Sequence, residues 1–247
     1  IWKQCGIHDE HIFIRIAVVT GGNKGIGLEV CRQLASKGIT VVLTARNEKR
    51  GSAAVQELKQ AGLHNVIFHQ LDITDSPGID QLADFLKGHF GKIDILVNNA
   101  ALGAVEYIED AAISSATSEP EQLKNEELKR ELDDIEKLTE KDLDEMLATY
   151  LKDFEAGALE ARGWPMHFSA YRMGQIAMNA YSRMIARRQP GLRINCANPG
   201  YVKTDISVYS GTLTPAEGAS NLLKVLLLPE GGPTGKYFDD GKEAPFV

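Results

Sequence analysis

Residues 16–27 read Ile-Ala-Val-Val-Thr-Gly-Gly-Asn-Lys-Gly-Ile-Gly, and this stretch decides the fold. Its apolar start, Ile16–Val19, is typical of a buried parallel strand. A glycine-rich turn with Gly21, Gly25 and Gly27 follows and leads into an amphipathic helix. In this arrangement the first glycine permits a tight turn, the second lets a pyrophosphate approach the backbone, and the third allows the helix to pack closely. Glycines can also merely end a strand, but the strand–turn–helix order favours a dinucleotide site at a helix N-terminus.

The rest of the chain extends this pattern to an α/β fold. Three more strands and three helices are expected in the first hundred residues, with strands at 40–43, 66–71 and 93–97 and helices at 27–36, 49–61 and 79–90. Such alternation predicts right-handed crossovers and a doubly wound parallel sheet, the Rossmann fold. The pattern resumes late in the chain with a helix at 169–188, a strand at 192–197, a helix at 216–227 and a strand at 235–238.

Length and composition suit one globular domain. The chain has 247 residues, of which 43% are hydrophobic and 25% charged, so we expect a single domain over residues 14–247 with residues 1–13 as a terminal extension. The net charge of −7 is uneven, because residues 119–162 hold 15 acidic and 7 basic side chains. Leucines at helical spacing make this segment an acidic helical insertion, either a solvated amphipathic hairpin or a lid over a cleft.

Several classes of partner are not expected. The acidic balance lacks the basic footprint of nucleic-acid binding, and no apolar stretch approaches the length that spans a membrane. The three cysteines show no metal-binding spacing and suggest a reducing compartment. Residues 1–11 lack the apolar region of a secretory signal. We therefore expect a cytoplasmic protein with a small-molecule partner, and a monomer is the working expectation.

The sequence motifs together resemble the short-chain dehydrogenase/reductase family, and more narrowly the plant carbonyl reductases of the salutaridine and menthone reductase group. The matching pieces are residues 20–27, Leu71-Asp72, Asn98-Asn99-Ala100, Tyr171 and residues 199–205. The resemblance covers nearly all of residues 15–247, including the helical insertion. It implies reduction of a ketone or aldehyde carbonyl with a nicotinamide cofactor.

The resemblance also implies roles for individual residues. The pyrophosphate would be held by the turn residues Gly21, Asn23, Lys24, Gly25, Ile26 and Gly27. Asp72 would bind the adenine amino group, and Asn98 and Ala100 would line the adenosine and ribose. Val202 and Thr204 would contact the nicotinamide carboxamide and a nearby phosphate. Asn98 and Thr204 could instead simply cap a strand end and a turn.

The cofactor type follows from the end of the second strand. An NAD site carries an acidic residue about 20 residues past the glycines, which binds the ribose 2′-hydroxyl. Here the strand ends in Thr44-Ala45-Arg46 without an acid. Arg46 can bind a 2′-phosphate bidentately, and Lys24 adds a second positive charge. Both could be ordinary solvated cations, but their two positions together favour NADP(H) as the cofactor.

The catalytic residues depart from the family pattern. The resemblance implies that Tyr171 exchanges the hydroxyl proton, but Gln175 stands one helical turn later, where the family has a lysine. Without that cation the tyrosine should be a poor base, although it could still donate a proton. The central fifth strand and its helix, which carry the family's serine and asparagine, are missing from the sequence. Ser114 and Ser115 follow no strand and are interpreted as loop serines.

Two functions follow as hypotheses. The first is an NADPH-dependent carbonyl reductase impaired by the loss of the lysine, serine and asparagine. The alternative is a truncated family member that binds the cofactor without turning over a substrate. The missing interior strand also predicts an exposed sheet edge, unless a later strand moves across to fill the gap.

Overall fold

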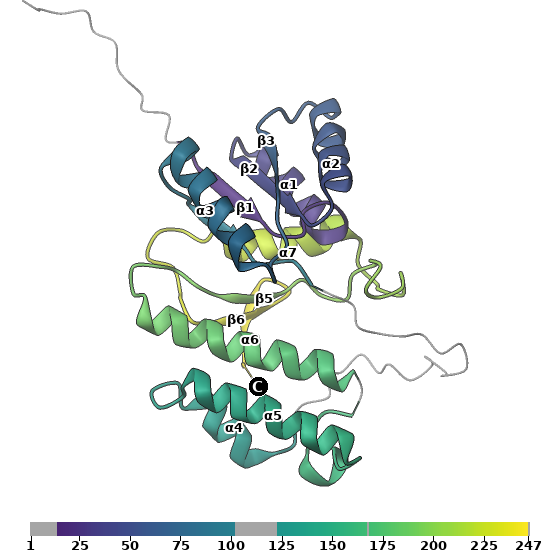
Figure 1. Cartoon of the computed structure of the whole chain (residues 1–247), viewed down its shortest axis with the longest axis vertical. Helices are drawn as coiled ribbons and strands as arrows, with labels where there is room; N and C mark the ends of the chain where they lie inside the picture. The colour runs from purple at the N-terminus through teal and green to yellow at the C-terminus, as the bar shows by residue number, and fades with distance from the viewer. Residues whose placement is uncertain (1–13, 102–122, 167, 247) are drawn as a thin grey trace, which may run out of the picture. The chain divides into compact units, whose positions relative to one another are not determined.

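The computed structural model describes residues 14–101, 123–166 and 168–246. These residues form two compact units (Figure 1). The first unit holds residues 14–101 and 202–223, and the second holds residues 123–201 and 224–246. The expected division into a 1–13 extension and a single 14–247 domain remains a prediction, and residues 1–13 lie outside the described part.

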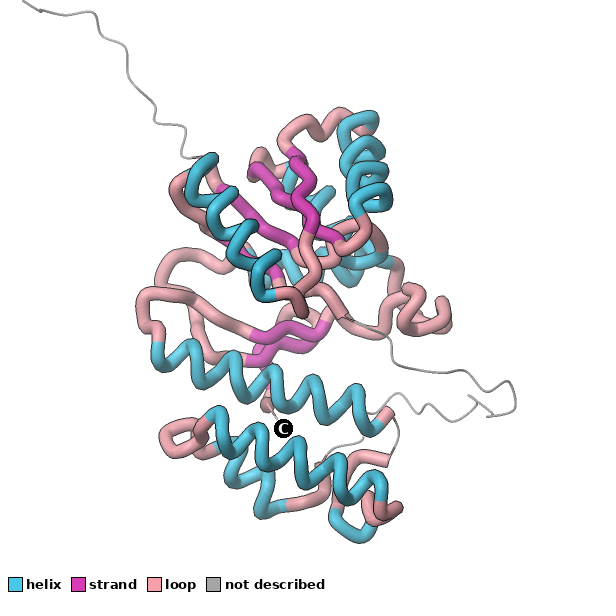
Figure 2. The backbone as a smooth tube through the Cα atoms, viewed as in Figure 1, coloured by secondary structure: helices cyan, strands magenta, loops and turns pink. Residues whose placement is uncertain are grey.

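A parallel sheet forms the centre of the first unit. Its strand order is β3-β2-β1-β4, and the strands are Ile16–Val19 (β1), Thr40–Ala45 (β2), Val66–Gln70 (β3) and Ile95–Val97 (β4). All three pairings are parallel, with Ala17 opposite both Val41 and Ile95. The helices of this unit are Gly25–Ser36 (α1), Glu48–Gln60 (α2), Ser76–Phe90 (α3) and the greater part of Pro215–Leu226 (α7). Figure 2 shows the strands side by side between helices.

Helices cover both faces of this sheet. On one face Val18 and Val42 pack with Leu82 and Leu86 of α3. Neighbouring residues along a strand point to opposite faces, so Leu43 lies on the other side, where it meets α1 close to Cys31. Strand β1 is buried along its whole length, as its unbroken apolar sequence predicts. The doubly wound α/β fold is therefore confirmed.

The second unit is built on three helices: Glu126–Asp133 (α4), Glu140–Glu155 (α5) and Ser169–Arg188 (α6). A shared apolar core joins them, made of Leu123, Leu132, Leu143, Met146, Tyr150, Leu159, Trp164, Met173, Ala177, Ala180 and Met184. Helix α5 begins with a capping box, in which Thr139 Oγ1 accepts from the Asp142 N–H at 3.2 Å and the Asp142 carboxylate accepts from the Thr139 N–H at 2.8 Å.

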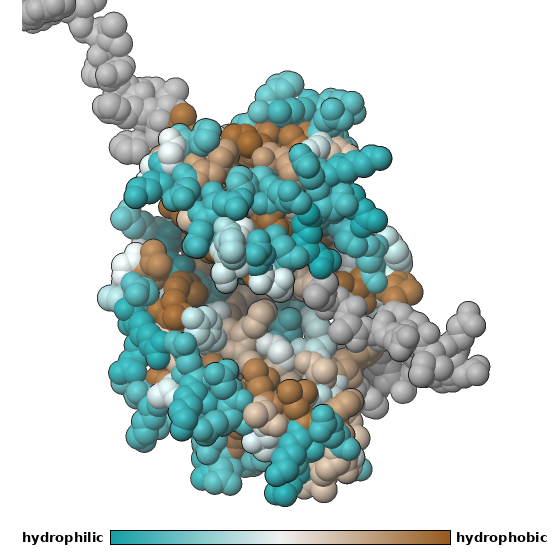
Figure 3. Space-filling model, in the orientation of Figure 1, coloured by the Kyte–Doolittle hydropathy of each residue, from teal (hydrophilic) through white to brown (hydrophobic). Residues whose placement is uncertain are grey.

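Charge complementarity adds to this apolar packing. Arg183 donates to Asp133 at 3.3 Å, Arg187 pairs with Glu136, and Arg188 donates to Glu140 at 2.5 Å. The basic end of α6 therefore offsets part of the acidity of the 119–162 segment. Hydrophilic residues cover much of the α4–α5 surface in Figure 3. The described part of the insertion is thus an amphipathic hairpin packed on α6, and its role as a lid stays untested.

A small separate sheet completes the second unit. Its order is β5-β6-β7, with strands Cys196–Asn198 (β5), Tyr237–Asp239 (β6) and Lys242–Ala244 (β7). Strand β5 pairs in parallel with β6, and β6 pairs antiparallel with β7. Strand β4 is consequently an edge of the four-stranded sheet, and Leu96 on it is 50% exposed. Within the described residues no later strand fills the place of the missing one.

The strand boundaries late in the chain differ from the prediction. The strand expected at 192–197 begins only at Cys196. Before it, the Ile194 N–H donates to Thr234 Oγ1 at 3.0 Å and Asn195 Nδ2 donates to the Pro233 carbonyl at 2.8 Å. Ile194 and Asn195 thus bond to the turn at Pro233 and Thr234, where the prediction expected hydrogen bonds to a neighbouring strand. Strand β7 was not predicted, because three residues carry no detectable alternation. No helix of the described residues is long and apolar enough to cross a membrane.

Candidate nucleotide site and catalytic tyrosine

The glycine turn leaves no space for side chains at two positions. Gly21 has φ of +64°, and a Cβ there would lie 3.0 Å from Ala100 Cα. A Cβ on Gly27 would lie 2.4 Å from Asn99 Nδ2 and 2.5 Å from the Gly21 carbonyl oxygen. Gly27 therefore lets α1 approach the turn itself and the end of β4. Side chains at either position would displace the backbone that is predicted to hold a pyrophosphate.

Thr20 and Asn99 fix the shape of this turn, and neither was predicted to have this role. Buried Thr20 donates through Oγ1 to the Val97 carbonyl at 3.3 Å, and the same oxygen accepts from the N–H groups of Asn99 and Ala100 at 3.0 Å each. The Asn99 amide donates to the Thr20 carbonyl at 2.9 Å. Asn99 thus links the ends of β1 and β4 by hydrogen bonds, whereas Asn98 is exposed. A buried threonine between a strand and glycines is the signal that could have indicated this role.

Helix α1 presents an uncapped N-terminus. Its N-cap residue, Lys24, is extended, and its side chain makes no capping hydrogen bond. No acidic residue lies in the first turn, and Gly25 and Ile26 start the helix. The first N–H groups of a helix need partners and carry the positive end of its dipole. This end of α1 can therefore bind an anion such as a phosphate. Asn23, the other turn residue predicted to contact the cofactor, is half-buried beside it.

Three cations belong to this part of the first unit. Arg46 follows β2 and is exposed, and its charge helps lower the pKa of Asp72. Arg50 lies in the first turns of α2, where its N–H donates to the cap residue Asn47 at 2.9 Å. Lys24 forms an ion pair with Asp205. Lys24 is therefore already paired with the Asp205 carboxylate. Arg50 is a further candidate phosphate ligand, which was not predicted from the sequence.

Asp72 closes a short turn after β3. One carboxylate oxygen accepts from the Thr74 N–H at 3.0 Å and from Thr74 Oγ1 at 2.8 Å. These two bonds, with a smaller contribution from Arg46, hold the pKa of Asp72 below its usual value. The carboxylate is thus ionised at neutral pH and could accept from an amino group. The binding of an adenine there remains a prediction.

Val202 and Thr204 belong to a loop that is bonded to itself. Val202 is buried and forms an isolated parallel bridge with Leu213. Ser207 Oγ donates to the Val202 carbonyl at 2.7 Å and accepts from the Thr204 N–H at 3.0 Å. The Thr204 methyl lies 3.4 Å from the place of a Cβ on Gly25. Thr204 is therefore next to the glycine turn, as a phosphate-contacting residue would need to be.

Tyr171 and Gln175 lie in the second unit, near the start of α6. Tyr171 is 50% exposed and Gln175 is half-buried. Partial burial raises the pKa of the Tyr171 phenol, and the opposing effect of the Arg172 guanidinium is smaller. Arg172 thus does not replace the missing lysine. The tyrosine stays protonated at neutral pH, which suits a proton donor and not a base.

A second tyrosine of the second unit, Tyr237, lies near Tyr171. Tyr237 on β6 is near enough for the charge of Tyr171 to raise its pKa, although burial is the larger cause. Asn198 at the end of β5 donates to Asp239 at 2.9 Å. None of these is a charged neighbour that would lower the pKa of Tyr171. Ser114 and Ser115, predicted to be loop residues, lie outside the described part of the chain.

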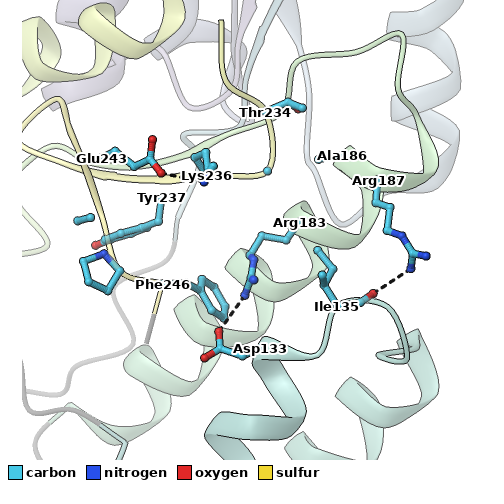
Figure 4. Close-up of a pocket in the computed structure, with 13 residues that line it drawn as sticks. Asp133, Ile135, Arg183, Ala186, Arg187, Thr234, Lys236, Tyr237, Glu243 and Phe246 are labelled. Carbon is cyan, nitrogen blue, oxygen red and sulfur yellow. Dashed lines mark hydrogen bonds and ion pairs between the residues drawn. The ribbon is translucent and has the colours of Figure 1, made fainter.

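The second unit also contains a cavity of about 820 Å³. It is lined by the α4–α5 connection, the end of α6 and strands β6 and β7, and the Arg183 and Phe246 side chains lie next to each other in it (Figure 4). The Arg183 guanidinium lies 4.3 Å from the centre of the Phe246 ring. Its cations are paired with Asp133, Glu136 and Glu243. None of the predicted site residues lines this cavity.

Comparisons with known proteins show the family of this chain. A family model described as short chain dehydrogenase matches residues 15–121. The chain is 37% identical to a (−)-isopiperitenone reductase of Mentha piperita, over 92% of this chain and 97% of the relative. It is 32% identical to carbonyl reductase [NADPH] 1 of Rattus norvegicus, over 94% and 98% of the two chains.

A solved structure gives the same result. Salutaridine reductase from Papaver somniferum superposes with a TM-score of 0.81 at 35% identity, covering 92% of this chain and 99% of that one. The alignment with the Mentha piperita reductase runs over 304 residues, more than the 247 of this chain, so the relative holds residues that this chain lacks. Sequence, fold and these similarities together show that the chain belongs to the short-chain dehydrogenases, a family of oxidoreductases.

Proposed function

We propose that this chain is an NADPH-dependent carbonyl reductase whose catalysis is impaired. The observation that carries the proposal is the glycine turn joined to the uncapped N-terminus of α1, with Lys24, Arg46 and Arg50 among the residues of the same unit. Relatives named as carbonyl, isopiperitenone and salutaridine reductases support a small ketone or aldehyde as the substrate.

The residues present fit a phosphorylated dinucleotide. Gly21 and Gly25 have positive φ values of 64° and 56°, which side chains rarely permit, so glycine at these positions gives the backbone the tight turn that a pyrophosphate would need. The first N–H groups of α1 would hold the pyrophosphate, as the dipole of the helix favours. Arg46 and Lys24 would bind the 2′-phosphate, with Arg50 as a further cation. When bound, NADPH supplies a hydride to the carbonyl carbon.

Tyr171 would complete the reduction. Its phenol, kept protonated by a raised pKa, would donate its proton to the carbonyl oxygen as the alcohol forms. Gln175, one turn further along α6, could hydrogen-bond a ribose hydroxyl but adds no positive charge. We therefore propose that reduction is less affected than oxidation, because oxidation requires the deprotonated phenol.

A second candidate function is cofactor binding without turnover. Two observations favour it: Gln175 stands in the place of the family's lysine, and the four-stranded sheet ends at β4 within the described residues. The insertions of the relatives in the alignments support the loss of an internal segment. This candidate differs from the first only in the rate of hydride transfer, so both share the same cofactor site.

The cofactor preference tests the proposed site. Arg46→Ala should weaken NADPH binding roughly ten- to a hundredfold, since a charge-assisted hydrogen-bonded pair contributes about 1.5–3 kcal/mol. NADH, which has no 2′-phosphate, should lose little. Fluorescence titration of both cofactors measures the two dissociation constants.

The matched control for this variant is Lys59→Ala, which removes an exposed cation from the last turn of α2, the helix that follows Arg46. Lys59→Ala should leave both affinities unchanged. Equal binding of NADPH and NADH by the original chain, or an unchanged preference in Arg46→Ala, would contradict the proposed 2′-phosphate site.

A further inference from the structure

The ion pair between Lys24 and Asp205 joins two segments of the proposed cofactor site. Lys24 is the N-cap of α1, and Asp205 follows Thr204 in the loop that lies beside Gly25. The side chain of Lys24 is 61% exposed and that of Asp205 is 49% exposed. A ligand arriving from solvent can therefore reach both charges. Exposed pairs of this kind are weak, so a stronger anion can displace the carboxylate.

The loop holds Asp205 in place from its other side. The Tyr209 hydroxyl donates to Asp205 Oδ1 at 2.5 Å, and the Tyr209 N–H donates to the Thr204 carbonyl at 2.9 Å. Both Val208 and Tyr209 adopt positive φ values, 47° and 59°. Such values are rare for large side chains, and rarest for a β-branched residue. Strained backbone of this kind is found where function requires one position of a side chain.

The electrostatic surroundings keep Asp205 negatively charged. Lys24 and the Tyr209 hydroxyl, with a smaller contribution from Arg50, hold the pKa of the Asp205 carboxyl below its usual value. At neutral pH the negatively charged Asp205 carboxylate is therefore paired with Lys24, a cation that is proposed to bind the 2′-phosphate. A phosphate that binds Lys24 has to displace this anion and also approach its charge.

We propose that Asp205 is a specificity-determining residue, which lowers the preference for NADPH by competing with the cofactor's 2′-phosphate for Lys24. The inference rests on the proposed function, since it assumes that the dinucleotide binds at the glycine turn. NADH has no 2′-phosphate, so the Lys24–Asp205 pair can persist when NADH binds. The Lys24–Asp205 pair thus lowers the affinity for NADPH and leaves the affinity for NADH unchanged.

Substitution of Asp205 by asparagine tests this inference. Asp205→Asn should tighten NADPH binding about two- to fivefold, the range expected when a weak surface ion pair no longer competes. Its effect on NADH should be negligible. Asp84→Asn is the matched control, because it removes one exposed negative charge from α3 in the same unit. Fluorescence titration with NADPH and NADH supplies all the dissociation constants.

A double-mutant cycle with Lys24→Ala separates competition from general repulsion. In the Lys24→Ala background, Asp205→Asn should no longer change NADPH affinity. An equal gain in that background, an equal gain for NADH, or no gain in the single variant would overturn the inference while leaving the cofactor site intact. If neither the original chain nor Asp205→Asn binds NADPH, the proposed function and this inference both fail.

Discussion

With saturating NADPH, the chain is expected to reduce ketones and aldehydes about 10²–10⁴-fold more slowly than carbonyl reductase [NADPH] 1 of Rattus norvegicus. Each missing acid–base or orienting group commonly costs a factor of this size, although such losses are not additive. Gln175 replaces the lysine, and the described residues contain no strand that could present the family's serine. The loss of NADPH absorbance with a panel of cyclic ketones and aldehydes measures the rate.

Two variants show whether any residual rate is enzymatic. Tyr171→Phe should lower the residual rate about tenfold or more if the phenol donates the proton. An unchanged rate in Tyr171→Phe would favour the cofactor-binding function without turnover. Gln175→Lys should restore little, because the serine and asparagine roles stay empty. Turnover within about tenfold of the relative would contradict the proposed impairment.

Trp164→Ala should destabilise the second unit by about 3–5 kcal/mol, the usual cost of deleting a buried large aromatic side chain. Trp164 is 5% exposed, and its ring meets that of Tyr150 edge-on at 5.6 Å. Its indole N–H donates to Asp153 at 2.9 Å. The substitution therefore leaves a cavity and removes a partner from Asp153. Urea unfolding followed by circular dichroism measures the loss without relying on tryptophan fluorescence.

Two controls identify the cause of that loss. Phe154→Ala removes an aromatic side chain that is 54% exposed on α5 of the same hairpin, and it should cost less than about 1 kcal/mol. Trp164→Phe keeps much of the apolar contact and should show an intermediate loss. Similar unfolding curves for Trp164→Ala and Phe154→Ala would mean that the hairpin is not packed through this core.

The fold of residues 16–97 could be predicted because apolar strands and helix caps in the local sequence indicate the same elements. The uninterrupted apolar run Ile16–Val19 can only be buried on both faces, and the capping residues Asn47 and Asp75 start helices α2 and α3 within a few residues of the expected positions. The role of Asn99 could not be predicted in this way. It depends on Thr20 carbonyl and hydroxyl groups that lie almost eighty residues earlier in the chain.

Long-range contacts also explain what the sequence left open in the second unit. Spacing alone could not show what the apolar face of the acidic segment packs against, because its partners are apolar residues of α6 such as Met173. The partner of Lys24 was missed for the same reason. Asp205 is 181 residues away along the chain, and no local pattern links the two charges.

The central claim is that the first unit, with the proposed nucleotide site, is native-like, whereas the second unit, with Tyr171, lacks the family's central strand. Hydrogen exchange along the whole chain tests this claim most directly. Strands β1 and β2 are almost completely buried, whereas all three residues of β5 are half-buried. We expect slow exchange in residues 16–97 and faster exchange in 101–170 and 192–197, with β5 among the least protected strands. Uniformly slow exchange in both parts would show that the sheet is stable without the missing strand and would contradict the account.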